Sequence, residues 1–333
     1  MKCVLHASKG HIDILKVMPS DTNWHPAVGA AIKAGQMQVL KWFQENNKVH
    51  IDNSSAVCNA AHSGKMDILL WLQKEFDLHD WNFEAAMWYA VNIGNLEMIQ
   101  YFKNSGVEVD PSICAEAAEQ GHFEILKWMH ENQCDWDSDT TTNAAKYGNL
   151  SILQWLIEVN CPIDATNLEE GAIQGGNLQL IKWVKSNLNI DWIDSKNCKL
   201  AIANGHWDIL EWLLDNECNY DDSVLKKALK KGASLPILER LYTSTVSIEK
   251  LCKTAGAYGR LEFIIWLANK NATYYEHTVW NNAYYGAVKE NQFDVMKKIY
   301  STYCVCTEKV SICTNLVPAY KWLRKQECAY NKQ

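Results

Sequence analysis

The chain has 333 residues, of which 48% are hydrophobic and only six are proline, so it is long and apolar enough to bury a large core. Its formal net charge of -7 and pI near 5.8 argue against general binding to nucleic acid or to anionic membranes. It contains no apolar run of the roughly 20 residues that a membrane span needs, and residues 1–6 do not read as a signal peptide. We therefore expect a soluble, cytoplasmic protein without a membrane partner.

A glycine that recurs about every 27 residues organises the whole sequence. Asparagine replaces it in the last two of twelve copies, so that the anchor positions are Gly10, Gly35, Gly64, Gly94, Gly121, Gly148, Gly176, Gly205, Gly232, Gly259, Asn291 and Asn315. Alanine stands four residues before ten of the twelve anchors, and tryptophan stands seven residues after eight of them. A period this regular predicts a solenoid of stacked repeats.

Each repeat reads as two helices. In the fifth repeat, Cys114, Ala117 and Ala118 share one helical face before the anchor Gly121, and apolar residues return with helical spacing after it. Glycine, or asparagine in its place, suits the left-handed backbone that often ends a helix. Aspartates at 110, 137, 194 and 221 offer N-caps for the first helices. The fold class predicted is therefore all-α.

Along the chain we expect a single array over residues 1–333, with capping repeats at both ends, where the alanine column is lost. Two interior repeats are irregular, around residues 225–245, where Arg240 replaces the expected tryptophan, and around residues 268–310, where aromatic residues crowd a long interval. The tryptophans between repeats, Trp81, Trp136 and Trp192, are expected to cover the short loops and so to be structural.

The stretch from Ala144 to Ile157 resembles the ankyrin repeat, in which Ala-Ala and two variable residues precede a glycine junction and a second apolar helix. The resemblance extends over about twelve repeats, but the Thr-Pro-Leu-His opening is absent and each repeat is shorter than the usual 33 residues. It implies an ankyrin-like solenoid of helical hairpins with short inter-repeat loops, which binds a partner on its concave first-helix face. Similar tryptophan-rich arrays in giant viruses and amoebae suggest a viral or protist effector, which would act in host cytoplasm.

Most of the twelve cysteines fall in repeated positions, and they are expected to be reduced core residues. The only local group, Cys304, Cys306 and Cys313 with His277 upstream, lacks zinc-finger spacing, so we expect no metal. His122 and His206 directly follow anchor glycines and are expected to hydrogen-bond the junction backbone. No motif for a cofactor, a phosphate loop or a catalytic triad is present.

Exposed positions one and two residues before each anchor, together with unexplained aromatic residues, are the candidate partner-binding sites. They are Trp88, Tyr89, Asn92, Glu119, Lys146 and Tyr147 in repeats four to six, and Lys230, Lys231 and Tyr258 in repeats nine and ten. Lys226, Lys227, Lys230 and Lys231 form a basic double stripe that is either a solvated helix face or a docking spot for an acidic partner.

The leading hypothesis is a monomeric, non-enzymatic scaffold for a protein partner. The alternative is an adaptor that recruits a substrate to a ubiquitin ligase. That role needs a ligase-binding segment, and Leu316-Val317-Pro318 is the only hint of one.

Overall fold

The computed structural model describes residues 2–19, 22–48, 53–76, 83–188, 190, 192, 194–243, 246–271 and 276–303. Over these residues the chain forms 22 helices and no strand. They are eleven consecutive helix pairs, and the twelfth predicted repeat, around Asn315, lies outside the described residues. The prediction of an all-α solenoid of helical hairpins is confirmed for the described residues.

The contacts divide the chain into two compact bodies, Met1–Leu180 and Ile181–Gln333. The first helix of each pair carries an odd number: α1 (Lys2–Ser8), α3 (His25–Lys33), α5 (Asn53–Ser63), α7 (Phe83–Asn92), α9 (Pro111–Gln120), α11 (Ser138–Lys146), α13 (Ala165–Gly175), α15 (Ser195–Asn204), α17 (Asp222–Lys231), α19 (Ile248–Ala257) and α21 (Glu276–Lys289). The second helices are α2 (Ile12–Lys16), α4 (Met37–Glu45), α6 (Met66–Glu75), α8 (Leu96–Asn104), α10 (Phe123–Glu131), α12 (Leu150–Glu158), α14 (Leu178–Asn187), α16 (Trp207–Asp215), α18 (Leu235–Leu241), α20 (Leu261–Lys270) and α22 (Phe293–Tyr303).

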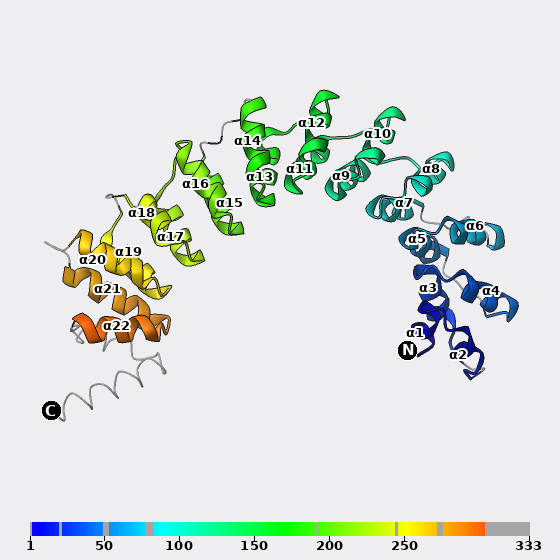
Figure 1. Ribbon diagram of the computed structural model, residues 1–333, viewed down its shortest axis with the longest axis horizontal. Coiled ribbons are helices and arrows are strands. Elements are labelled where there is room, and N and C mark those ends of the chain that lie inside the picture. Colours follow the sequence, from blue (N-terminus) through cyan, green and yellow to red (C-terminus); the bar gives the residue numbers. More distant parts are fainter. Residues whose placement is uncertain are drawn as a thin grey trace. The chain divides into compact units, whose positions relative to one another are not determined.

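First helices pack side by side within each body. In the N-terminal body they contact one another in sequence from α1 to α13, and in the C-terminal body α15 contacts α17, α17 contacts α19, and α19 contacts α21 (Figure 1). Apart from α13, each first helix also contacts the second helix of its own pair, as α9 contacts α10. The outer faces of neighbouring first helices therefore form a continuous surface within a body, which we call the first-helix face.

The anchor glycines end the first helices in the left-handed conformation. All ten have positive φ, between 69° at Gly64 and 92° at Gly232, and Asn291 takes the same role at 59°. Asparagine tolerates this region better than other residues with a Cβ atom. The prediction of a glycine C-cap with asparagine as its substitute is confirmed for every anchor within the described residues.

At several junctions the side chain of the residue after the anchor hydrogen-bonds to the preceding repeat. Asn149 Nδ2 donates to the Ala118 carbonyl at 2.7 Å, near the end of α9, and Arg260 Nε donates to the Leu229 carbonyl at 2.8 Å, near the end of α17. His122 Nε2 lies 3.2 Å from the Asn92 carbonyl, which confirms the junction role expected of that histidine. These side chains satisfy carbonyls that a helix end leaves without an intrahelical partner.

The alanine column lets first helices approach closely. All ten alanines have no exposed surface: Ala31, Ala60, Ala90, Ala117, Ala144, Ala172, Ala201, Ala228, Ala255 and Ala287. At three places even alanine is too large. A Cβ atom on Gly175 would lie 1.9 Å from the Lys146 carbonyl oxygen of α11, and Gly256 and Gly286 lie equally close to the backbones of α21 and α19. Glycine is thus required there for space and not for its φ angle.

The tryptophan column packs neighbouring second helices together. The ring of Trp155 lies 5.4 Å from that of Phe123 and 5.7 Å from that of His130 on α10, and Trp71 Nε1 donates to Gln44 Oε1 on α4 at 3.1 Å. Trp136 and Trp192 in the loops meet the column tryptophans of their own repeats edge to face, at 5.9 Å in both cases. These two loop residues are therefore structural, and Trp81 lies outside the described residues.

Four of the first helices begin at the aspartates that were predicted as N-caps. Asp110, Asp137, Asp194 and Asp221 are N-caps whose carboxylates accept hydrogen bonds from the backbone N–H two residues on, and Asp164 also caps its helix. The loops between repeats are short, as at residues 132–137 between α10 and α11.

The ninth repeat differs from its neighbours in its second helix. That helix, α18, has only seven residues, and Arg240 forms an ion pair with Asp215 at 2.6 Å. In the eleventh repeat, Trp280 and Tyr284 of α21 are buried in the core, which accounts for part of the aromatic crowding there.

We predict that Gly175→Ala lowers the free energy of unfolding by about 2 kcal/mol or more, because its methyl group forces α13 away from the Lys146 carbonyl. The matched control is Gly29→Ala in the middle of α3, where the nearest atom would be 3.9 Å away. That control should be neutral or should stabilise by up to about 1 kcal/mol through helix propensity. Urea unfolding of both variants checks this, and equal effects would contradict the close approach.

Candidate functional site

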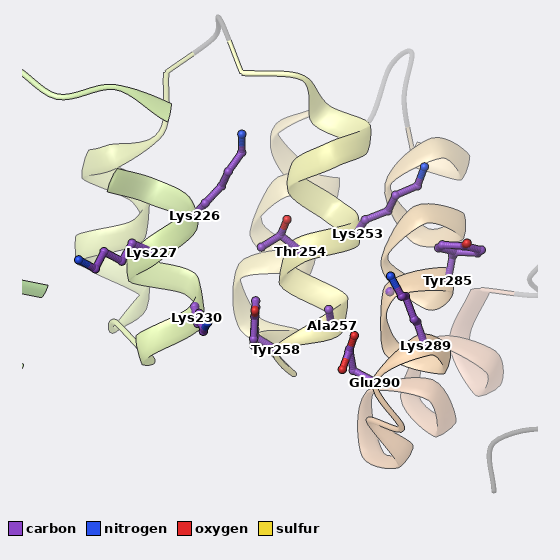
Figure 2. A pocket seen from close by; sticks show the side chains of 11 residues that line it. Lys226, Lys227, Lys230, Lys253, Thr254, Ala257, Tyr258, Tyr285, Lys289 and Glu290 are labelled. Atoms are coloured by element: carbon purple, nitrogen blue, oxygen red, sulfur yellow. The ribbon is translucent and has the colours of Figure 1, made fainter. Parts of the chain in front are cut away.

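A basic groove crosses three neighbouring first helices, α17, α19 and α21, in the C-terminal body. It has a volume of about 490 Å³, and the residues that line it are Lys226, Lys227, Lys230, Lys253, Thr254, Ala257, Tyr258, Tyr285, Gly286, Lys289 and Glu290. Figure 2 shows Lys226 extending from α17 toward α19, and Lys289 extending from α21 back toward α19. Lys227 extends to the other side of α17 in the same view.

The floor of the groove depends on the close contact between α19 and α21. A Cβ atom on Gly286 would lie 2.0 Å from the Lys253 carbonyl oxygen, and one on Gly256 would lie 1.9 Å from the Ala283 carbonyl oxygen. The two backbones therefore nearly touch, and only the small side chains of Thr254 and Ala257 stand above them. The long lysine side chains at the sides make this shallow seam into a groove.

Positive charge dominates the groove. Five of its lining residues are lysines and one, Glu290, is a carboxylate. None of the five lysines pairs with a carboxylate of the described residues, whereas Lys199 of α15 does pair with Asp221 at 3.0 Å. The Lys253 ammonium lies 5.6 Å from the centre of the Tyr285 ring, and Tyr258 is 37% exposed at the edge of the groove. An anion that enters would meet ammonium groups not already neutralised.

The structure brings Lys230 and Tyr258 together in this groove, as two of the three site residues predicted in this region. The third, Lys231, is exposed but lies outside the lining. Lys253, Tyr285 and Lys289 were not among the predicted site residues. A signal for them existed, because the lining residues occupy the positions six, five, two and one before each anchor, and positions six and five had been singled out only in the ninth repeat.

A second surface, which we call the acidic aromatic surface, lies on α7, α9 and α11 of the N-terminal body. It comprises Trp88, Tyr89, Glu116, Glu119 and Tyr147. Trp88 is 40% exposed and meets the Tyr89 ring edge to face at 5.2 Å. Glu116 accepts hydrogen bonds from Asn92 at 2.8 Å and from Gln120 at 3.0 Å, so the predicted site residue Asn92 orients a carboxylate.

Tyr147 interacts with two other predicted site residues, Glu119 and Lys146. Its hydroxyl hydrogen-bonds to the Glu119 carboxylate, which raises the pKa of Tyr147 above its ordinary value, with burial and the charges of Glu119 and Glu116 adding to the shift. The Lys146 ammonium lies 5.4 Å from the centre of the same ring. Because Tyr147 is 47% exposed, its ring remains open to a partner.

The cysteines form no disulfide among the described residues. Seven of the eight described cysteines are buried and Cys58 is half-buried. Cys198 and Cys218 face each other within one repeat with their sulfurs 3.0 Å apart, so two of the repeated cysteine positions meet. Burial raises the pKa of the Cys114 and Cys252 thiols to about 12. These thiols are poor nucleophiles at neutral pH.

Among the described residues, no three or more histidine, cysteine, aspartate or glutamate side chains come together in a way that could hold a metal ion. Cys304, Cys306 and Cys313 lie outside these residues, as does the side chain of His277. None of the described helices is long and apolar enough to cross a membrane.

Comparison with known proteins gives similarity in fold only. No family model matches the chain, and no curated protein matches it in sequence. Among solved structures, the human ASB11 ankyrin repeat domain is 17% identical with a TM-score of 0.39, covering 48% of this chain and 84% of that one. The maize pentatricopeptide repeat protein PPR10 is 11% identical with a TM-score of 0.34, covering 89% of this chain and 45% of that one. The same protein in complex with an 18-nt psaJ RNA element gives a TM-score of 0.37 at 11% identity and covers 90% and 55%. The chain thus spans about half the length of PPR10.

We predict that Tyr147 ionises at higher pH than an ordinary tyrosine, and that Glu119→Gln lowers its pKa, because a neutral amide neither repels the phenolate nor stabilises the neutral phenol as strongly as a carboxylate. NMR titration of tyrosine-labelled protein measures this, with Tyr147→Phe assigning the signal. An unchanged titration in the Glu119→Gln protein would contradict the hydrogen bond.

Proposed function

We propose that the protein is a non-enzymatic, monomeric scaffold of the cytoplasm that holds a protein partner on its first-helix face. The observation that carries the proposal is where the exposed aromatic rings and the unpaired lysines lie. The exposed aromatic residues Trp88, Tyr147 and Tyr258 and the unpaired groove lysines all lie on first helices or directly at their C-terminal ends. The second helices instead use their tryptophans to pack repeats together.

A binding role also fits the chemistry of the described polar groups. The buried thiols have raised pKa values, and the described carboxylates that are hydrogen-bonded cap helices, as Asp221 does, or orient surface networks, as Glu116 does. These are arrangements that position a surface. They do not place a nucleophile beside a base, which covalent catalysis needs.

A protein partner is favoured over RNA, although one of the similar solved structures is of a protein in complex with RNA. The chain carries a net charge of -7, and Glu116 and Glu119 stand in the middle of the acidic aromatic surface. A nucleic-acid strand would be repelled by both. The ubiquitin-ligase alternative depends on Leu316-Val317-Pro318, which lies outside the described residues, so no described feature favours it.

Affinity purification with mass spectrometry, followed by binding measurements with the purified partner, tests the proposal. Two first-helix variants are compared with the wild type: Trp88→Ala/Tyr147→Ala and Lys226→Gln/Lys253→Gln. The matched control is Ile14→Ala/Leu70→Ala, which removes two exposed apolar side chains, 41% and 47% exposed, from second helices.

We expect at least one first-helix variant to bind the partner about tenfold more weakly, because exposed aromatic and charged side chains at the centre of an interface carry most of its free energy. The control should bind like the wild type. A partner that both first-helix variants retain at full affinity, or that the control loses, would overturn the proposal.

A further inference from the structure

The basic groove is the place where the first-helix face departs most from the charge of the chain as a whole. A protein with a net charge of -7 brings five lysines and a single carboxylate to one depression. Like charges gathered without partners repel one another and destabilise the fold. Lysines that only solvate a helix need not come together in this way. Lys231 and Lys250, on the same helices, are exposed and lie outside the lining of the groove.

The arrangement of the lysines repeats from helix to helix. Lys226 and Lys253 occupy the position six residues before the anchors of neighbouring repeats, and Lys230 and Lys289 occupy the position two residues before theirs. Equivalent positions on packed helices are separated by roughly the interaxial distance, about 8–10 Å for an ordinary pair such as α17 and α19 and less for α19 and α21, whose backbones nearly touch. A ligand that meets several of these ammonium groups therefore needs negative charges at about that interval.

An extended polypeptide supplies such an interval. In the extended polyproline II conformation residues rise by about 3.1 Å each with three residues per turn, so side chains three positions apart lie on the same face about 9 Å apart. The floor of Thr254, Ala257 and Gly286 is low enough for a peptide backbone to lie across the helices. The Thr254 hydroxyl donates to the Lys250 carbonyl at 2.8 Å and can still accept from a backbone N–H, and the Tyr258 hydroxyl at the edge can donate or accept.

Single-stranded nucleic acid fits the groove less well. Such strands are held by aromatic rings on which successive bases stack, and the groove has two rings, of which Tyr285 already lies beneath the Lys253 ammonium. A strand in the groove would therefore find one further ring, that of Tyr258, on which a base could stack.

Resting on the proposed function, we propose that the basic groove binds an extended acidic segment of a partner protein, with carboxylates spaced about three residues apart crossing α17, α19 and α21. Lys226, Lys253 and Lys289 contact the carboxylates, and Tyr258 packs against the segment at one edge. The groove thereby selects an acidic partner sequence. The acidic aromatic surface in the other body, which contains Glu116 and Glu119, would instead favour a basic one.

Fluorescence anisotropy at low salt tests the proposal with a fluorescein-labelled peptide of about a dozen residues that has glutamate at every third position and serine and glycine between. Its glutamine version and a labelled oligouridine of similar length are the comparison probes. The protein variants are Lys226→Gln/Lys253→Gln and the charge-matched control Lys231→Gln/Lys250→Gln, which removes two exposed lysines from α17 and α19 outside the groove. Circular dichroism shows that both variants fold.

We expect the glutamate peptide to bind the wild type and the control variant alike, about tenfold more weakly to the groove variant, and the glutamine peptide not to bind. Equal binding by the groove and control variants, no binding of the glutamate peptide, or tighter groove-dependent binding of oligouridine would each overturn the inference. The proposed scaffold function survives these failures if the Trp88→Ala/Tyr147→Ala variant still loses the partner.

Discussion

The junction between neighbouring repeats is the constraint on which the rest of the structure depends. Each described anchor takes a left-handed conformation, and at most of them the side chain that follows the next anchor lies over the glycine. Several of these side chains donate to a carbonyl beside it, as those of Asn95, Asn149 and Arg260 do. Gly94 illustrates both functions, since its φ is 78° and a Cβ atom there would lie 2.7 Å from the His122 ring. His122 in turn reaches the Asn92 carbonyl. One position therefore ends a helix and fixes where the next repeat sits.

The binding surfaces follow from this register. Because each repeat is set on the previous one in the same way, equivalent positions of neighbouring first helices come side by side, and their side chains add up to a surface. In the C-terminal body this gathers lysines from three helices into one groove. In the N-terminal body it sets Glu116 of α9 against Asn92 of α7, and Tyr147 at the end of α11 against Glu119. The charge of each surface thus depends on a few exposed positions per repeat, while the alanine and tryptophan positions of the core stay the same in most repeats.

Much of the fold could be predicted from the sequence because its determinants are local and repeated. The left-handed anchors, the aspartate N-caps and the buried alanine column each depend on neighbouring residues in one repeat. The groove could not be predicted in the same way. Its walls come from three repeats, and its floor requires α19 and α21 to approach through Gly256 and Gly286, which carry no distinctive local signal.

The contact between Cys198 and Cys218 shows the same limit. Each cysteine occupies a repeated position, but their distance depends on how the loop after α16 returns to α15. Lys230 and Lys231 are adjacent in sequence and equally charged, and only the helix geometry decides that the first lines the groove and the second does not. Residue type and period predicted the helices and their caps, whereas the composition of the groove depends on how neighbouring repeats pack.

Urea unfolding of Gly94→Ala and Gly205→Ala tests the junction most directly. Both glycines have positive φ, 78° and 82°, so alanine should cost about 1–2 kcal/mol of backbone strain at either position. Of these two glycines, Gly94 lies beneath a side chain of the next repeat and Gly205 does not. The residue that could cover Gly205 is Ala233, and no atom lies within 4 Å of a Cβ atom built on Gly205. We predict that Gly94→Ala lowers the free energy of unfolding by about 1 kcal/mol more than Gly205→Ala does, through loss of the His122 hydrogen bond. Equal losses in the two variants would contradict the account.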